Sequence, residues 1–441
     1  MTCNIKRRDF LKLAGAGGLI TAPLALFPAP AFAQSQNVNS KLNVACIGIA
    51  NRGGANVDGV SRENMVALCD IDENFLSKGK ERFPQAKLFR DYRKMYDEIE
   101  KSIDAVVVST PDHTHAAPSI IGMKLGKHCY CEKPLAHNVK EIRDMMAVAR
   151  ETKLATQLGT QIHAEDNYRR VVELVRTNAV GAIREIHVWC SARTGGRPFS
   201  TDTPPVPPNI DWDLWLGPAP VRPYHPQYFG GNWRAYWAFG NGALGDFGCH
   251  YMDLPFWALN LRLPKTVEAF CETKPTAEVS PIRLRVEYTF PARQTSSRGT
   301  LPPLTLNWYD GGLKPTALIE EKNVPNWDNG VLFIGEEGML IADYGQRMLL
   351  PQEKFADYPA PEPTIPKSVG HHQEWINACK TGSETTCHFD YSGPLAETAL
   401  LGTVAFRVGK KLEWDTARMK ATNCPEADQY LSRVYRKGWE V

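Results

Sequence analysis

The chain has 441 residues, of which 43% are hydrophobic and 23% charged, and its formal net charge at pH 7 is +2. This length suffices for two packed domains of ordinary size, and the composition excludes an intrinsically disordered chain. No run of basic residues is interleaved with aromatic residues, so we expect no nucleic-acid partner.

The first 33 residues have the pattern of an export signal. The twin arginine Arg7-Arg8 precedes a mildly apolar stretch over residues 13–27, which is too short and glycine-rich to span a bilayer, and Ala31-Phe32-Ala33 offers a cleavage site. Lys6 stands where twin-arginine signals usually have Ser or Thr. We predict a signal peptide over residues 1–33, cleavage after Ala33, folded export to the periplasm by the Tat machinery and no stable membrane insertion. The alternative is a basic tail on a cytoplasmic protein.

Cysteines would suggest disulfides in an exported protein, but the chain has eleven, an odd number. Most lie in apolar strand-like runs, as Cys46 and Cys69 do. Cys129 and Cys131 alternate faces on a predicted strand, so they cannot chelate one ion together. We interpret the cysteines as buried free thiols and predict no metal site.

After a linker over residues 34–40, short apolar runs alternate with helical patterns. Strands are expected at Leu42–Gly48, Met65–Asp70, Ala105–Val108, His128–Cys131 and Ala155–Leu158, and helices from Asn56 and over Ala116–Leu125 and Val139–Glu151. Such alternation specifies a parallel, doubly wound sheet. We predict a Rossmann domain over residues 41–163 in an α/β fold.

The pattern changes after Arg169, where a helix to Asn178 leads into strand-like segments with little helix between them. These segments are Ile183–Ser191, Thr266–Thr273, Ile282–Phe290, Leu304–Trp308, Val331–Ile334 and Met339–Asp343. We predict an α+β domain over residues 164–441 with an open, mostly antiparallel sheet. Its long insertion, residues 195–263, is rich in Pro, Trp and Tyr, and we interpret it as facing the substrate.

The first strand ends in the turn Gly48-Ile49-Ala50-Asn51-Arg52-Gly53. Gly48 allows a sharp turn and Gly53 allows close helix packing, so a pyrophosphate would sit at the helix N-terminus, although Ala50 replaces the usual middle glycine. Asp70 follows about 20 residues later, where an acid can bond a ribose 2′-hydroxyl. Asp70 and Asp72 would together repel a 2′-phosphate, which favours NAD over NADP.

Lys133 lies in Tyr130-Cys131-Glu132-Lys133-Pro134, at the end of the fourth strand. Ligands of parallel sheets bind at this edge. An ammonium in a dry cleft beside a cationic nicotinamide has its charge disfavoured, so it could accept or relay a proton. The alternative is a solvated lysine paired with Glu132.

These motifs, with Thr110-Pro111, His115 and Gly245-Asp246-Phe247-Gly248-Cys249-His250, resemble the glucose-fructose oxidoreductase and inositol dehydrogenase (Gfo/Idh/MocA) family. The resemblance runs from about Lys41 to the C-terminus. It implies a Rossmann domain followed by an open-sheet domain, which often forms the oligomer interface, and hence a homo-oligomer, a dimer or a tetramer. It also implies a lysine close to the nicotinamide and the reacting carbinol.

Asp246 and His250 are four residues apart, which places them on one face of a helix. A carboxylate there can orient an imidazole, which takes the proton of a hydroxyl while hydride leaves its carbon. The resemblance implies His250 as the base, Asp246 as its partner or a hydroxyl ligand, and Lys133 as a relay. The alternative is a helix-capping Asp and a core His.

The remaining site predictions are less specific. Cofactor contacts are expected at Gly48, Ala50, Asn51, Arg52, Gly53, Asp70, Thr110, Pro111, His115, Glu132, Lys133 and Gln161. Substrate contacts are expected at His163, which follows the last Rossmann strand where the two domains should meet, and at Asp253, which extends the face of Asp246 and His250. They are also expected at Trp233 and Tyr236, because aromatic walls suit sugar rings, although half of the aromatic group that includes Trp237 and Phe239 would be core. His113 and His371-His372 could be helix caps or ligand contacts.

The predicted function is an exported, NAD-dependent oxidoreductase that takes hydride from a secondary hydroxyl of a sugar, glycoside or cyclitol. Free nicotinamide is not expected outside the cytoplasm, so NAD should stay tightly bound and be reset in place. One alternative is a glycoside hydrolase or lyase that oxidises the sugar transiently and eliminates the aglycone. The chain lacks the Tyr-Pro-Thr-His pattern of that branch, which favours simple oxidoreduction. A second alternative is a non-catalytic nucleotide-binding module.

Overall fold

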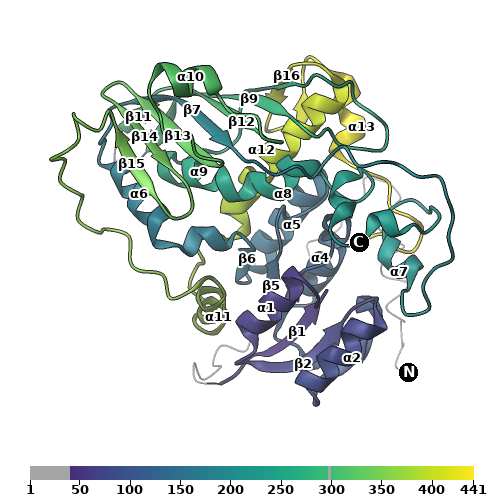
Figure 1. Cartoon of the computed structure of the whole chain (residues 1–441). Helices are drawn as coiled ribbons and strands as arrows, with labels where there is room; N and C mark the ends of the chain where they lie inside the picture. Colours follow the sequence, from purple (N-terminus) through teal and green to yellow (C-terminus); the bar gives the residue numbers. More distant parts are fainter. Residues whose placement is uncertain (1–39, 296–298) are drawn as a thin grey trace, which may run out of the picture. The chain divides into compact units, whose positions relative to one another are not determined.

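The computed structural model describes residues 40–295 and 299–441. The predicted signal peptide, its twin arginine and cleavage site, and the linker up to residue 39 lie outside these residues. Within them, the chain forms a parallel sheet and then a larger mixed sheet (Figure 1). The predicted α/β fold class is confirmed.

The N-terminal sheet is the predicted Rossmann sheet, with six parallel strands in the order β3-β2-β1-β4-β5-β6. They are β1 (Asn43–Ile47), β2 (Asn64–Cys69), β3 (Lys87–Phe89), β4 (Ala105–Val108), β5 (His128–Cys131) and β6 (Thr156–Leu158). Strand β4 reads Ala-Val-Val-Val and is buried throughout, as a strand covered on both faces should be. The strand order reverses between β1 and β4, which creates the crevice where such sheets bind ligands.

Five helices connect these strands: α1 (Arg52–Val60), α2 (Glu73–Arg82), α3 (Tyr92–Ile99), α4 (Ala116–Lys124) and α5 (Val139–Thr152). The prediction that the first helix starts at Asn56 was wrong, because α1 begins within the glycine turn itself. The sequence analysis also missed α2, β3 and α3. Helix α2 buries only Leu76 and Gly79 among polar residues, so its apolar periodicity is weak.

The second sheet has nine strands in the order β15-β14-β13-β7-β12-β9-β8-β16-β17. They are β7 (Ile183–Trp189), β8 (Thr266–Phe270), β9 (Arg285–Phe290), β12 (Leu304–Tyr309), β13 (Gly330–Gly335), β14 (Met339–Ala342), β15 (Arg347–Leu350), β16 (Leu412–Asp415) and β17 (Lys420–Ala421). Strands β7 and β12 pair in parallel, and the other neighbours in this sheet pair antiparallel. The mostly antiparallel sheet is therefore confirmed. A short hairpin, β10 (Arg293–Thr295) with β11 (Gly299–Leu301), is separate from it.

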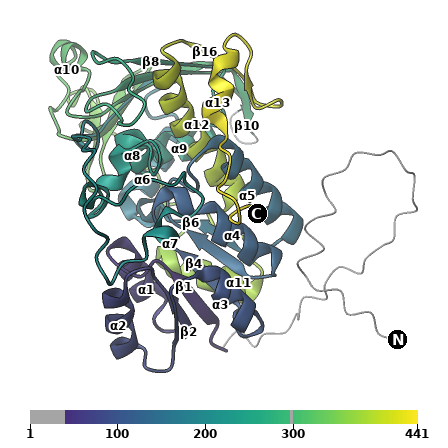
Figure 2. The ribbon, with the colours of Figure 1, turned by 90° about the vertical axis from the view of Figure 1, so that its right-hand side faces the viewer.

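A layer of helices lies between the two sheets (Figure 2). It contains α6 (Asp166–Arg176), α8 (Gly242–Tyr251), α9 (Asp253–Leu259) and α12 (Phe389–Val408). Helix α12 contacts α5 and β6 on one side and α8 and β8 on the other. One apolar core runs through the layer, from Val106 of β4 through Leu395 to Val286 of β9. The site that the helices carry is thus held against both sheets.

Helix α11 (His371–Thr381) packs on the Rossmann sheet, although it falls within the range 164–441 predicted for the second domain. Trp375 and Ile376 share an apolar cluster with Leu42 and Val44. Trp375 is fully buried, and its ring packs edge-on against that of Tyr130 in β5. The C-terminal half of the chain therefore supports the strand that carries Lys133.

Ten of the eleven cysteines lie in the described residues. All ten are free thiols, and only Cys271 is not fully buried, which confirms the interpretation for these ten. No helix within residues 40–295 and 299–441 is long and apolar enough to cross a membrane.

We expect Trp375→Ala to lower the free energy of unfolding by about 3–5 kcal/mol, because it removes a fully buried indole and leaves a cavity beneath β5. Urea unfolding of the wild type, Trp375→Ala and the milder Trp375→Phe measures the loss. A loss below about 1 kcal/mol in the alanine variant would contradict this packing.

Candidate functional site

The turn after β1 is built for a phosphate. Gly48 has φ 78°, and a Cβ there would lie 2.7 Å from the carbonyl oxygen of Ser109. A Cβ on Gly53 would collide with the carbonyl oxygen of Gly48. Among the described residues no side chain caps the N-terminus of α1, and Asn51 and Arg52, where α1 begins, line the pocket.

Two carboxylates stand at the carboxyl end of β2. Asp70 accepts hydrogen bonds from the N–H groups of Ile49, at 3.0 Å, and Asp72, at 3.1 Å, so it also fixes the glycine turn. Burial raises the pKa of Asp70 to about 6, against the lowering effect of these N–H groups. Asp72 caps α2 through the N–H of Asn74. Both aspartates line the same pocket, where they can meet a ribose.

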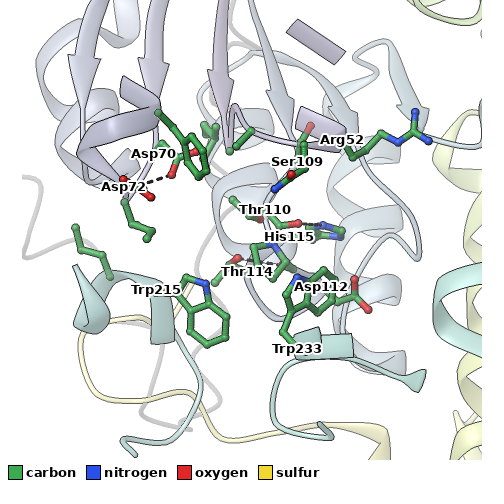
Figure 3. A pocket seen from close by; sticks show the side chains of 18 of the residues that line it. Arg52, Asp70, Asp72, Ser109, Thr110, Asp112, Thr114, His115, Trp215 and Trp233 are labelled. Atoms are coloured by element: carbon green, nitrogen blue, oxygen red, sulfur yellow. Dashed lines mark hydrogen bonds between the residues drawn. The ribbon is translucent and has the colours of Figure 1, made fainter. Parts of the chain in front are cut away.

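This pocket has a volume of about 660 Å³, and its lining includes Asp72 and Thr110 (Figure 3). Lys133 also lines it. The hydroxyl of Thr110 is buried and has no hydrogen-bond partner in the described part of the chain. These features suit a dinucleotide. The glycine turn and the helix N-terminus can bind its pyrophosphate, the two aspartates its ribose, and the Thr110 hydroxyl can make a further hydrogen bond to it. Of the predicted cofactor residues, all but Gly53 and Gln161 line the pocket.

The insertion closes the pocket on the side opposite the sheet. Asn209 binds Asp72 through its side chain at 2.8 Å, and its carbonyl accepts the N–H of Glu73 at 3.0 Å. Beyond this attachment, Trp215 of α7 (Trp212–Leu216) and Trp233 lie across the pocket from the Rossmann turns (Figure 3).

The C-terminal tail fastens the insertion in place. Arg436 donates to the carbonyl oxygen of Gly217 at 3.0 Å and pairs with Asp213. Trp439 reaches the pocket wall, where the guanidinium of Arg93 stacks on its ring at 3.8 Å. Two segments far apart in the sequence, the insertion and the C-terminal tail, therefore form part of the pocket wall.

At the other end of the pocket, one carboxylate is shared by two cations. Lys133 Nζ donates to the Asp246 carboxylate and, at 2.6 Å, to its carbonyl oxygen. Arg234, from the turn η6 (Asn232–Ala235), binds the same carboxylate oxygen at 2.8 Å. Burial alone would raise the pKa of Asp246, but the positive charges of Lys133 and Arg234 hold this pKa below its usual value. Lys133 is not paired with Glu132 through its side chain, which corrects that alternative.

His250 follows Asp246 by one turn of α8 and is half-buried. Within the described residues, the His250 imidazole donates no hydrogen bond to the Asp246 carboxylate, one oxygen of which binds both Lys133 and Arg234. His250 Nδ1 is buried and has no partner among the described residues. Burial, with the charge of Lys133, lowers the pKa of His250 to about 3, so the imidazole is neutral at pH 7 and able to accept a proton.

Glu132 and Gln161 brace the site. Glu132 accepts hydrogen bonds from Asn56 and Gln161, both at 2.9 Å, and Gln161 also donates to the Tyr130 hydroxyl at 2.7 Å. These bonds use both N–H groups of the Gln161 amide, and Gln161 does not line the pocket, so its predicted cofactor contact stays a prediction.

Three predicted substrate residues lie in the protein interior. His163 and Asp253 form a fully buried pair at 2.8 Å, and Asp253 also accepts from the hydroxyl of Tyr391. Tyr236 is buried in the core of the insertion and donates to the carbonyl oxygen of Pro198. These residues are core, so their predicted substrate contacts were wrong. Trp233 alone of the four lines the pocket.

The other histidines hold segments together through backbone or side-chain oxygens. His113 binds the carbonyl oxygen of Trp215 in the insertion, and His115 binds that of Thr110 beside the pocket. His371 binds the carbonyl oxygen of Leu158, and His372 binds the Asn56 side chain. Burial lowers the pKa of His113 and His115 to about 3, so both are neutral at pH 7.

Sequence reasoning missed Arg234 and Asp112. The only sequence feature that pointed to Arg234 is its place directly after Trp233. In the structure its guanidinium stacks on the Trp233 ring at 4.2 Å. Asp112 directly follows the Thr110-Pro111 motif, but the sequence did not predict it as a site residue. It lines the pocket, and burial raises its pKa to about 7, against the lowering effect of Arg234 and Lys133.

Comparisons with known proteins agree with this geometry. Residues 42–160 match the sequence model of an oxidoreductase family described as an NAD-binding Rossmann fold, and residues 187–441 match the C-terminal alpha/beta domain of the same family. The chain belongs to the Gfo/Idh/MocA oxidoreductase family. Its cofactor is therefore NAD, as predicted.

The chain is similar to two curated relatives and two solved structures. An alpha-N-acetylgalactosaminidase of Shewanella oneidensis and a glycosyl hydrolase family 109 protein of Shewanella sp. ANA-3 are each 28% identical over 204 residues, 41% of this chain and 44% of theirs. The chain thus spans less than half the length of these relatives. The WlbA dehydrogenase of Bordetella pertussis, in complex with NADH and UDP-GlcNAcA, has a TM-score of 0.60 at 15% identity and covers 85% of this chain and 99% of its own. The aldose-aldose oxidoreductase of Caulobacter crescentus has a TM-score of 0.55 at 17% identity, covering 85% and 100%. At these identities the structures share the fold.

We expect Asp112→Asn to change how stability depends on pH. The raised pKa of Asp112 means that the folded state keeps its proton up to about pH 7, whereas an unfolded aspartate loses it near pH 4. The wild type therefore loses stability as pH rises from about 4 to 7, by at most about 4 kcal/mol from this group, and the variant does not. Denaturant unfolding of nucleotide-free samples at pH 5 and pH 8 measures this. An equal difference between variant and wild type at both pH values would contradict the buried, unpaired carboxyl.

Proposed function

We propose that this protein is an NAD-dependent oxidoreductase that removes hydride from a secondary hydroxyl carbon of a sugar, glycoside or cyclitol. The observation that carries the proposal is that Lys133 and Arg234, which line one end of the dinucleotide pocket, both bind Asp246, one turn of α8 before the neutral His250.

In this proposal His250 accepts the proton of the reacting hydroxyl. Its imidazole is neutral at pH 7, and its Nδ1 lacks a protein partner among the described residues. Lys133 and Arg234 bring two positive charges against the single negative charge of Asp246, so the cluster favours the negative charge that grows on the hydroxyl oxygen. Bound NAD supplies the hydride acceptor.

The enclosure of the pocket supports a cofactor that stays bound. Asn209 and Arg436 hold the insertion beside the pocket at two separate points, which supports slow release of a bound dinucleotide. We propose that the hydride is returned to a second carbonyl substrate in the same site, so that one NAD molecule serves successive turnovers.

A second candidate is glycoside cleavage, in which oxidation at one carbon acidifies the neighbouring C–H, the aglycone is eliminated and the sugar is reduced again. The names of the curated relatives favour it. Cleavage of a nitrophenyl N-acetylgalactosaminide without net NADH formation would support this candidate over simple oxidoreduction.

We also propose export and self-association. Export rests on the Arg7-Arg8 motif and agrees with a retained cofactor, since a protein exported folded can carry NAD with it. A homo-oligomer, a dimer or a tetramer, would form through the second sheet, whose other face the helix layer covers.

We expect His250→Ala and Lys133→Ala to lower sugar-dependent reduction of bound NAD by about 10²–10⁴-fold, the usual contribution of an acid–base group. Single-turnover absorbance of NADH at 340 nm, over a panel of sugars, methyl glycosides and inositols, measures this.

Lys124→Ala is the matched control, because Lys124 is an exposed lysine at the end of α4 outside the site. It should keep the wild-type rate. A wild-type rate in His250→Ala or Lys133→Ala, with NAD still bound, would sink the catalytic assignment.

A further inference from the structure

A second, shallow cavity lies beside α8 and is separate from the dinucleotide pocket. Its floor is the turn of residues 343–346 between β14 and β15, and its volume is about 390 Å³. Its lining residues are Tyr251, Asn329, Asp343, Tyr344, Gly345 and Gln346. None of them lines the dinucleotide pocket.

The cavity is coupled to the proposed base. Tyr251 follows His250 in α8, and the hydroxyl of Tyr168 donates to the carbonyl oxygen of His250 at 3.2 Å. The Tyr168 ring packs edge-on against Tyr344, with centroids 6.0 Å apart. Burial raises the pKa of the Tyr344 phenol, and the neighbouring Tyr251 and, more weakly, the Asp246 carboxylate add to this rise.

Tyr344 presents an aromatic ring to solvent from a rigid support. Its inner face stacks on Tyr251 with centroids 4.7 Å apart, and the residue is 37% exposed. The turn is fixed by Asp343, which accepts the N–H groups of Gly345 and Gln346, both at 2.8 Å. A preorganised aromatic face binds the apolar face of a sugar ring at little entropic cost.

The polar groups of the cavity suit a neutral polyol. The side-chain oxygen of Asn329 accepts from the N–H and hydroxyl of Ser191, and within the described residues its amide nitrogen donates to no protein acceptor. No cationic side chain lines the cavity, which disfavours phosphate or carboxylate ligands.

We propose that this cavity is a subsite for a second pyranose ring, joined to the sugar whose hydroxyl reacts at His250. The inference rests on the proposed function and adds that the substrate is a glycoside of at least two rings rather than a free monosaccharide or cyclitol. Tyr344 is the residue that distinguishes the two classes.

The test is saturation-transfer NMR on the NAD-containing protein with maltose, cellobiose, lactose and melibiose, and with methyl glucosides and galactosides. For at least one disaccharide, the wild type should transfer saturation to both rings. In Tyr344→Ala, transfer to one ring should be lost and the affinity should fall at least about tenfold. Tyr344→Phe, which keeps the ring, should bind as the wild type does, and methyl glycosides should bind all three proteins equally.

Binding of no disaccharide, or unchanged binding in Tyr344→Ala, would overturn the subsite. Sugar-dependent reduction of NAD, measured on the same samples, separates this failure from that of the proposed function. Reduction of NAD by a disaccharide at a rate that Tyr344→Ala does not change overturns the subsite and leaves the proposed oxidoreductase function standing. Binding of a disaccharide that depends on Tyr344, without any reduction of NAD, would support the subsite and overturn the proposed oxidoreductase function. Tyr344→Ala should retain its nucleotide, which checks that it is folded.

Discussion

The buried ion pair between Lys133 and Asp246 is the interaction on which the site depends. Lys133 ends a strand of the Rossmann sheet, and Asp246 belongs to a helix that packs between the two sheets. Loss of Asp246 would leave Lys133 and Arg234 without their shared counter-charge, and an uncompensated buried charge costs several kcal/mol in proteins. The pair therefore holds the end of the dinucleotide pocket against the helix that carries His250.

Arg234 gives this pair its chemical character. With two cations on one carboxylate, the cluster keeps net positive charge, and the same charges that hold Asp246 ionised also help to keep His250 neutral. A neutral base beside net positive charge suits removal of a proton from a hydroxyl, because the base is free and the growing negative charge is stabilised.

The insertion serves both ends of the pocket. At one end it carries Arg234 and α8, and at the other its Asn209 binds the Rossmann edge at Asp72. The C-terminal tail then fixes it through Arg436. An enzyme whose nucleotide must not be lost needs such an enclosure, because dissociation is slowed when several independent contacts must break before the ligand leaves.

The sequence predicts those parts of the fold whose cause is local. The Ala-Val-Val-Val run of β4 can only be a buried strand, and the two glycines of the turn follow from steric limits that a Cβ would violate. Helix α12 is buried on almost every side, so it lacks the periodicity that would have revealed it.

The site was predicted only in part for a related reason. The spacing of Asp246 and His250 places both on one helix face, but it does not show that Arg234, brought in by the fold, competes for the carboxylate. Trp233 and Tyr236 stand in the same aromatic stretch of the sequence. The packing of the insertion places Trp233 in the pocket wall and Tyr236 in the apolar core.

The central claim is that the enclosed pocket retains NAD, and the most direct measurement is to identify the nucleotide that the native protein keeps. After extensive dialysis, the protein is denatured and the released material is identified by mass spectrometry and quantified against the protein. The account predicts close to one NAD(H) per chain and no NADP. Absence of nucleotide, with only weak binding of added NAD, would contradict it.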